Sequence, residues 1–409
     1  MSKTLAVSPL ALPLPELPVV GGVRFATAEA GIRYRGRTDV LLADFAPGTT
    51  VAGVFTRNKC PGAPITWCRD ILPRGSARGL LVNAGNANVF NGASGAAAVR
   101  ASAVAAARAL TCTAEEIFLA STGVIGEPMP AEKITSVTDG LAARLSPDGW
   151  RAAASAIMTT DTFPKAATRT TMIGSTSVRI SGIAKGSGMI APDMATMLAF
   201  VVTDAAIPAP MLQTMLVQAI EPTFNCITVD SDTSTSDTVL LFATGSAGNA
   251  PIAHTKDLKA FRLALLGVLH DLAQMVIRDG EGARKLIEIT VTGAVSRRSA
   301  RRVGLAIANS PLVKTAVAGE DANWGRIVMA VGKAGEPAER DRLAVAVGGV
   351  WMAREGRVVD GYQEAPVVTH MRGSEIKIAV DLGMGRGSAV VWGCDLTHGY
   401  IDINGSYRS

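Results

Sequence analysis

Short apolar runs recur along the whole chain and are bounded by glycine or by polar residues. Runs of this length that are rich in valine, leucine and isoleucine are typical of buried strands. They predict strands at 51–55, 79–83, 197–202, 238–243, 286–292, 343–347, 349–352, 375–380 and 387–392. A further pair of segments, 170–173 and 177–183, is joined through Gly174-Ser175 and predicts a hairpin.

Longer alanine-rich or amphipathic segments lie between these strands. They predict helices at 95–110, 147–158, 208–219 and 255–277. Strands interleaved with long helices indicate an α/β fold in which a layered sandwich of β-sheets is packed between helices. The polar stretches 297–310 and 334–341 are expected to be linkers within one compact body.

The length and apolar content of the chain allow a large core but predict no membrane span. The chain has 409 residues, 48% of them hydrophobic, and no window approaches 18 consecutive apolar residues. The first fifteen residues contain three prolines and lack the continuous apolar core of a signal peptide. We therefore expect a cytoplasmic protein without a membrane partner.

The cysteine and histidine patterns support neither a disulfide framework nor a metal site. The five cysteines include no CxxC pair, and the four histidines form no HxH or HxxxH pair. We expect reduced thiols, no metal, and no Ser-His-Asp mechanism. The net charge is +5, but the clearest basic cluster, 297–302, has no interleaved aromatic residue, so nucleic acid is not an expected partner.

Two glycine- or asparagine-rich runs resemble ligand loops only in part. Residues 383–387 follow a predicted strand but precede another strand instead of a helix, so they lack the context of a dinucleotide or phosphate loop. A dinucleotide-dependent enzyme is therefore a weak alternative. Residues 83–88 precede the alanine-rich helix and have two interpretations. Their backbone N–H groups could cradle an anion, or their asparagine side chains could bond the backbone in a structural turn.

The segment 185–202 carries the most informative chemistry. Lys185 and three small residues lead through a proline-containing loop to Thr196, which begins an apolar run. If the Ala195–Thr196 bond were cut, Thr196 would carry its own base, because a new α-amino group has a pKa of about 7.7–8.0. A glycine-rich turn before a core strand, with threonine chosen for its β-propensity, explains the same residues.

Other segments carry polar groups that suit an acyl-transfer site. Thr122-Gly123 lies in a tight turn after a short strand and could offer donors to an oxyanion. The run 158–165 is dense in hydroxyls, Glu281 lies between glycines after a long helix, and the chain ends in the polar segment 400–409. A turn, a helix cap or a C-terminal flap explains each of them equally well when it is taken alone.

Taken together, these segments closely resemble the ornithine acetyltransferase family of arginine biosynthesis, whose members are often bifunctional. The resemblance covers nearly the whole chain and includes residues 82–88, 224–235, 309–315 and 321–326. Its most specific element is the run Ala-Pro-Asp-Met-Ala-Thr-Met-Leu at 191–198. The resemblance implies the layered α/β fold of N-terminal-nucleophile enzymes.

The resemblance also implies roles for individual positions. It makes Thr196 the nucleophile and Ala195–Thr196 a self-cleaved bond, which gives an α chain of 1–195 and a β chain of 196–409. Two chains of each kind would form a heterotetramer. Thr122 and Gly123 match the oxyanion-hole pair. The positions that match the substrate pocket are Thr159, Lys185, Thr196, Glu281, Asn404 and Ser409. The family more often ends in threonine, and Ser409 keeps its hydroxyl and terminal carboxylate.

The implied reaction moves an acetyl group from N2-acetyl-L-ornithine to L-glutamate through an acetyl-threonine, with no metal or prosthetic group. Charge complementarity assigns Glu281 to the cationic amine of ornithine and Lys185 to the nucleophile or the substrate carboxylates. A structural contact of Lys185 with the glycine-rich loop is the alternative. No motif decides whether acetyl-CoA is a second acetyl donor.

Two other functions remain open on the residues alone. An N-terminal-nucleophile aminopeptidase or amidohydrolase of the related fold would pass the acyl group to water instead of glutamate. A non-enzymatic ligand-binding protein would use the glycine and asparagine loops, and it would have no reason to be split at Thr196.

Overall fold

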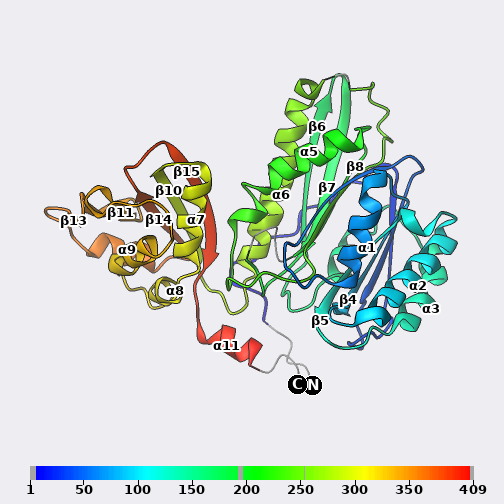
Figure 1. The fold of residues 1–409 in the computed structure, drawn as a ribbon, viewed down its shortest axis with the longest axis horizontal. Helices are drawn as coiled ribbons and strands as arrows, with labels where there is room; N and C mark the ends of the chain where they lie inside the picture. The colour runs from blue at the N-terminus through cyan, green and yellow to red at the C-terminus, as the bar shows by residue number, and fades with distance from the viewer. Residues whose placement is uncertain (1–5, 192–196, 253, 406–409) are drawn as a thin grey trace.

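The computed structural model describes residues 6–191, 197–252 and 254–405. Three predicted site residues, Ala195, Thr196 and Ser409, lie outside these ranges. The described chain forms a sandwich of two sheets between helices and a separate C-terminal lobe built on a third sheet (Figure 1). The layered α/β fold expected from the sequence is confirmed.

The first sheet has the strand order β1-β2-β4-β5, antiparallel except for the parallel pair β4–β5. Its strands are β1 (Val23–Ala28), β2 (Val40–Phe45), β4 (Gly79–Asn86) and β5 (Ile117–Val124). The helices that pack on it or against its edge are α1 (Ala63–Ile71), α2 (Gly92–Leu110), α3 (Ala131–Ala142) and α4 (Trp150–Ala156). Helix α4 also contacts β7 of the second sheet and so bridges the two sheets.

The second sheet has the order β3-β9-β8-β7-β6 and is covered on its outer face by two helices. Its strands are β3 (Thr50–Phe55), β6 (Lys165–Ile173), β7 (Thr176–Lys185), β8 (Leu198–Thr203) and β9 (Thr238–Ala243). The covering helices are α5 (Ala209–Ile220) and α6 (Lys259–Arg278). Strands β8 and β9 are parallel, while β8 is antiparallel to β7.

Strand β8 shows why an unbroken apolar run is needed in the second sheet. Side chains alternate between the two faces of a strand. Phe200 and Val202 therefore face the first sheet, whereas Ala199 and Val201 face the layer of α5 and α6. All four are buried. Because neither face meets water, no polar position interrupts the run, and this pattern predicted the strand.

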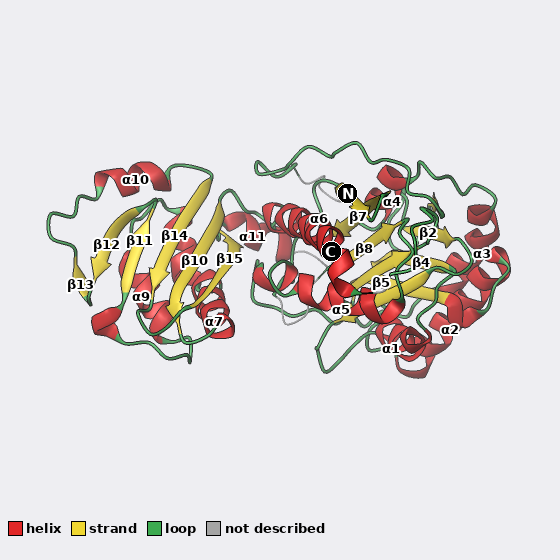
Figure 2. Cartoon of the chain, turned by 90° about the horizontal axis from the view of Figure 1, so that it is seen from above, coloured by secondary structure: helices red, strands yellow, loops and turns green. Residues whose placement is uncertain are grey.

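The C-terminal lobe contains the third sheet, in the order β13-β12-β11-β14-β10-β15. Its strands are β10 (Leu286–Ala294), β11 (Ala344–Val347), β12 (Val350–Arg354), β13 (Arg357–Val358), β14 (Glu375–Asp381) and β15 (Gly387–Cys394). Its helices are α7 (Arg297–Ala308), α8 (Pro311–Ala318), α9 (Trp324–Gly332) and α10 (Ala365–Met371). Figure 2 shows this sheet apart from the sandwich, with α11 (His398–Asn404) lying between the two.

Most predicted elements are confirmed with small changes in their bounds. The hairpin is β6–β7, and the helix predicted at 255–277 begins with a 3-10 turn at Thr255–Leu258 before α6. The linker predicted at 334–341 is irregular up to a short 3-10 turn at Arg340–Arg342.

The linker predicted at 297–310 is wrong, because residues Arg297–Ala308 form helix α7. Ser296 caps this helix by accepting the backbone N–H of Ser299. Val303 and Ile307, spaced four residues apart, bury one face against β10 and β15, while the arginines stay on the other face. The arginines in its first turns made the segment look like a solvated connection.

In the part of the chain that the structure describes, one helix is long and apolar enough to cross a membrane by length and composition alone, the segment Lys256–Arg278. Half of the most apolar stretch of this helix is buried within the protein, and the helix packs against β6 and β7. It is therefore the core helix of the second sheet.

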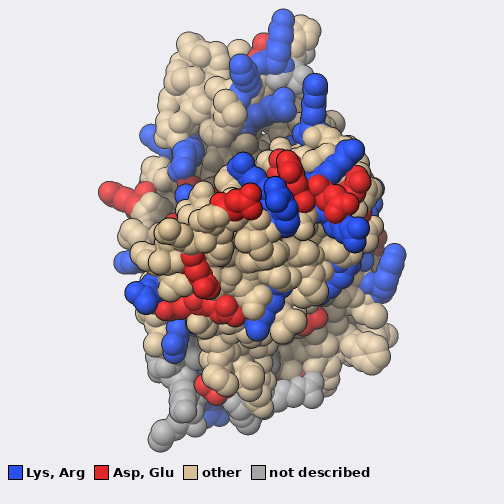
Figure 3. All heavy atoms as spheres, turned by 90° about the vertical axis from the view of Figure 1, so that its left-hand side faces the viewer, with Lys and Arg blue, Asp and Glu red and all other residues tan. Residues whose placement is uncertain are grey.

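The outer face of the C-terminal lobe carries basic and acidic side chains next to one another (Figure 3).

Candidate active site

One cavity of about 150 Å³ opens at the end of the sandwich where β5, β7, β8 and β9 meet. All the predicted site residues that the structure describes line it, namely Thr122, Gly123, Thr159, Lys185, Glu281 and Asn404. These residues come from strands, loops and a helix that are far apart in the sequence. Met197, the residue bonded to Thr196, lines the same cavity.

Gly123 is held in a conformation that only glycine adopts readily. Its φ is +130°, and a Cβ atom built there would lie 2.3 Å from the carbonyl carbon of Gly85. Gly85 and Gly123 are partners in the parallel pair β4–β5. The close approach of two strands therefore requires glycine at the position that matches the oxyanion hole.

Lys185 ends β7 and reaches two of the other predicted site residues. Its Nζ donates to Thr159 Oγ1 at 2.8 Å and to Thr122 Oγ1 at 3.2 Å. In the antiparallel register Lys185 is opposite Leu198, at the start of β8. Burial lowers the pKa of Lys185, although Asp161 opposes this effect. The lysine thus ties the oxyanion strand to the hydroxyl-rich loop.

A fully buried ion cluster supports this wall of the cavity. Lys165 Nζ bridges Asp161 Oδ1 at 2.7 Å and Asp279 Oδ2 at 2.6 Å, with all three side chains inaccessible to solvent. Asp161 also accepts the backbone N–H groups of Thr159 and Gly186, at 3.0 and 2.6 Å. Burial raises the pKa of Asp161, but Lys165 and then Lys185 outweigh burial and hold it below its usual value. Asp161 is therefore a carboxylate that fixes the loops on both sides of Lys185.

Glu281 lines the same cavity and lies in the turn that follows α6. It is 8% exposed, and its Oε2 accepts Asn404 Nδ2 from α11 at 2.7 Å. Its backbone N–H donates to the carbonyl of Ser187 at 2.9 Å, so the turn is tied to the glycine-rich loop. Burial raises the pKa of Glu281, and the hydrogen bond from Asn404 offsets part of that rise.

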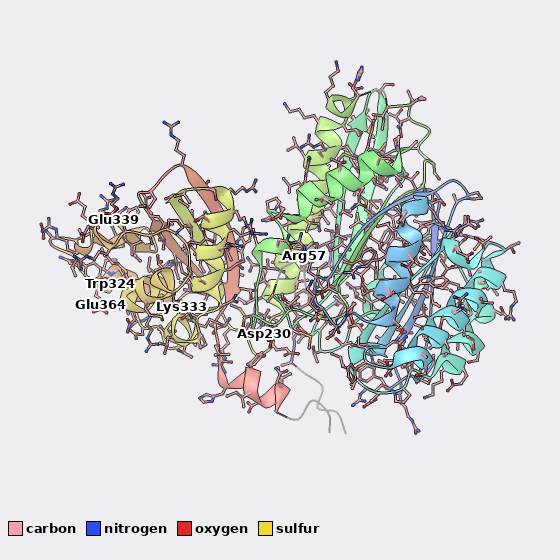
Figure 4. The ribbon with its side chains drawn as sticks, viewed as in Figure 1. Arg57, Asp230, Trp324, Lys333, Glu339 and Glu364 are labelled. Atoms are coloured by element: carbon pink, nitrogen blue, oxygen red, sulfur yellow. The ribbon has the colours of Figure 1, made fainter. Side chains whose placement is uncertain are left out.

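Asp230 holds the glycine-rich loop and the C-terminal helix together. It accepts the N–H groups of Met189 and Ile190 at 2.7 and 2.8 Å and the hydroxyl of Tyr400 at 3.2 Å. It lies where the C-terminal lobe meets the sandwich (Figure 4). No pattern in the sequence indicated a role for this aspartate, for Asp161 or for Lys165.

The asparagine-rich run before α2 is a structural turn. Asn83 Nδ2 donates to the carbonyl of Asn86 at 2.9 Å, and Asn86 Oδ1 accepts the N–H of Asn88 at 2.8 Å. These side chains bond the local backbone, as expected of the second interpretation of this run.

Among the described residues, no group of three or more His, Cys, Asp or Glu side chains could hold a metal ion. All five cysteines are free thiols. Cys68, Cys226 and Cys394 are buried, and burial raises the pKa of each.

The family match described next makes this chain an enzyme with transferase activity, and its layered sheets surround a cavity that combines Gly123 at positive φ, a buried lysine and a buried carboxylate. The ArgJ family model matches residues 24–409. The chain therefore belongs to the ArgJ family, whose curated members function in arginine biosynthesis.

Similar proteins support this assignment along the whole chain. The arginine biosynthesis bifunctional protein ArgJ of Gluconobacter oxydans is 62% identical, and the match covers 100% of this chain and 97% of that protein. The protein of the same name from Mesorhizobium japonicum is 58% identical, with 100% of both chains covered. The crystal structure of the arginine biosynthesis bifunctional protein argJ from Bacillus halodurans is 42% identical, with a TM-score of 0.50. The match covers 52% of the present chain and 100% of the chain in the Bacillus halodurans structure.

Proposed function

We propose that this enzyme transfers an acetyl group from N2-acetyl-L-ornithine to L-glutamate through an acetyl group carried on Thr196. The observation that supports the proposal most directly is the convergence of Thr122, Lys185 and Glu281 on one cavity, next to the residue that follows Thr196. The ArgJ relatives provide the setting of arginine biosynthesis.

The proposed mechanism begins with self-cleavage at Ala195–Thr196, which gives α and β chains of 1–195 and 196–409. The free α-amine of Thr196 then takes the proton of its own hydroxyl, since its pKa is about 7.7–8.0. Oγ attacks the acetyl carbon, and donors at Thr122 and Gly123 stabilise the oxyanion by about 2.7–4 kcal/mol each. Ornithine leaves with the proton, and the amine of glutamate then attacks the acetyl-threonine.

Substrate recognition in this proposal depends on two charged residues of the cavity, Glu281 and Lys185. The carboxylate of Glu281, already held by Asn404, accepts the ammonium group of the ornithine side chain. Lys185 also lines the cavity and donates to Thr122 and Thr159, and in this proposal it attracts the substrate carboxylates. Asn404 lines the pocket from α11, and Ser409, which lies outside the described residues, is proposed as a further substrate contact.

Acetyl-CoA is proposed as a second acetyl donor, and no resident cofactor is needed. The curated relatives are named bifunctional, which favours a second activity on the same nucleophile. Formation of N-acetylglutamate from acetyl-CoA and glutamate, with N-acetylornithine left out, tests this part. A rate equal to that of a Thr196→Ala variant would restrict the enzyme to the ornithine donor.

The two chains are proposed to remain together as a heterotetramer of two α and two β chains in the cytoplasm. Strand β8 of the proposed β chain pairs with β7 of the α chain, and β9 pairs with β3. The whole chain of the Bacillus halodurans structure corresponds to 52% of this chain, close to the share that residues 196–409 represent. Native mass spectrometry measures the assembly directly.

The nucleophile is tested with Thr196→Ala and Thr196→Ser. The alanine variant should remain a single chain of 42.3 kDa without transferase activity, whereas serine should cleave and turn over in part because the hydroxyl is kept. Two fragments from the alanine variant on a denaturing gel would overturn the assignment. Release of free acetate at the rate of ornithine formation, with glutamate present, would instead favour the aminopeptidase-type hydrolase.

A further inference from the structure

Asp237 is a second carboxyl group in the cavity, and the proposed mechanism gives it no role. It is 2% exposed and lines the cavity. Neither of its carboxyl oxygens has a hydrogen-bond partner in the part of the chain that the structure describes. A buried carboxyl without a partner costs free energy, so its retention in a reactive cavity points to a chemical use.

Three neutral donors and one cation surround Asp237. The N–H of Met197, the hydroxyls of Ser234 and Thr56, and the ammonium group of Lys185 are the polar groups that face it. The hydroxyl of Thr56 donates to the carbonyl of Ser234 at 2.6 Å. Lys185 is directed to Thr122 and Thr159. Among these four groups, only Lys185, on β7, is charged. The N–H of Met197 and the hydroxyls of Thr56 and Ser234 are neutral.

The sheet register brings Asp237 next to the start of β8. Thr238, the residue after Asp237, donates its N–H to the carbonyl of Met197 at 3.0 Å and pairs with Leu198 in the parallel ladder. The carboxyl of Asp237 faces the N–H of Met197, and that nitrogen is bonded to the carbonyl carbon of Thr196. Glu281, the other carboxyl of the described lining, is instead engaged with Asn404 from α11.

Burial raises the pKa of Asp237 well above its usual value, and the N–H of Met197, the two hydroxyls and Lys185 offset this only in part. Burial thus shifts Asp237 towards the neutral acid. A neutral carboxyl can donate a proton from one oxygen and accept a proton on the other.

Self-cleavage needs such a group because the base used in turnover does not yet exist. Before cleavage the nitrogen of Thr196 belongs to the peptide bond with Ala195, so it cannot take the hydroxyl proton. It must also gain a proton before it can leave.

We propose that Asp237 is the proton carrier of self-cleavage, an inference that depends on the proposed role of Thr196. As the bond from Thr196 Oγ to the carbonyl carbon of Ala195 forms, the free oxygen of Asp237 takes the hydroxyl proton. As the carbon–nitrogen bond breaks, the O–H of Asp237 gives its proton to the nitrogen. The carboxyl ends with the same number of protons, the chain carries an ester and a free amine, and water then hydrolyses the ester.

The test follows the first minutes of the full chain, made by cell-free translation with a pulse of labelled methionine and resolved on denaturing gels. Asp237→Asn, which keeps the shape but cannot exchange the two protons, should slow the conversion of the 42.3 kDa chain by about 10²–10⁴-fold. Asp237→Glu should recover part of the rate. The matched control is Asp204→Asn, because Asp204 is also a buried carboxyl with a raised pKa but follows the far end of β8, outside the cavity.

The pH profile of the wild-type chain keeps the inference testable if the asparagine variant folds poorly. The conversion rate should fall as the pH rises through the raised pKa of Asp237, since the acid form is the reactive one. A folded Asp237→Asn variant should lose this part of the profile, whereas titration of Lys185 would leave it in place. Conversion of Asp237→Asn at the wild-type rate would overturn the inference. Cleavage of Thr196→Ala would instead overturn the proposed function.

Discussion

Gly188 leaves room for Glu281, and an alanine there tests whether this carboxylate binds the substrate amine. A Cβ on Gly188 would lie 2.3 Å from Oε2 and 2.4 Å from Cδ of Glu281, far inside van der Waals contact. The carboxylate is the end of a flexible side chain, so it should rotate away and leave the backbone in place. That rotation would break its 2.7 Å hydrogen bond with Asn404.

The displaced carboxylate would lose one charge-assisted hydrogen bond to the substrate ammonium. Such a bond contributes about 1.5–3 kcal/mol, which corresponds to a roughly 10- to 150-fold rise in the KM for N-acetylornithine. The rate of N-acetylglutamate formation at varied N-acetylornithine, with glutamate held saturating, measures this change. Self-cleavage should continue in Gly188→Ala, because the hydroxyl of Thr196 is unchanged.

Gly140→Ala is the matched control for this substitution. Gly140 lies in α3, and a Cβ there would meet nothing within 4 Å. Alanine should stabilise the helix slightly and leave the KM unchanged. If Gly188→Ala also kept the wild-type KM, Glu281 would not be the group that binds the amine.

Two further predictions concern the buried charges of the site. Lys165→Ala should lower the free energy of unfolding by about 3–5 kcal/mol, because the carboxylates of Asp161 and Asp279 would stay buried without their cation. Urea unfolding measures this loss, and a change below about 1 kcal/mol would contradict the structural role of the cluster. The KM for N-acetylornithine should rise as the pH falls through the raised pKa of Glu281, because protonation removes the charge that binds the amine. The KM of Glu281→Gln should be high and flat over the same range, and an equally flat wild-type profile would contradict this role.

The sequence predicts most of the sandwich because several of its strands are buried on both faces and bounded by clear breaks. The run 197–202 became β8 with a shift of one residue, and 238–243 matches β9 without any shift. Helix α7 was missed because, in the sequence, its arginines alternate with the small apolar residues that face the sheet. A search for apolar positions at three- and four-residue spacing, such as Ala300, Val303 and Ile307, would have found it.

The support of the site could not be predicted in the same way. Lys165 and Asp279 are 114 positions apart in the chain, and no local pattern indicates that they meet. The spacing of Asp161 and Lys165 is a weak signal, since it is also common on exposed helices. Asp237 could not be predicted for another reason. Its raised pKa is caused by burial, and the sequence does not indicate that a single aspartate next to serines is buried.

The place of the proposed cleavage explains how one backbone bond can be broken without loss of the fold. Strands β8 and β9 follow the bond and lie side by side between β3 and β7, which precede it. Strand β8 pairs with β7, and β9 pairs with β3. Phe200 and Phe242 on these strands are buried in the core shared by the two sheets, and separation would expose them to water. The cleaved chains are therefore held by the same register as the precursor. A nucleophile two positions before β8 is closely followed by a rigid strand, while cleavage makes its own amine free.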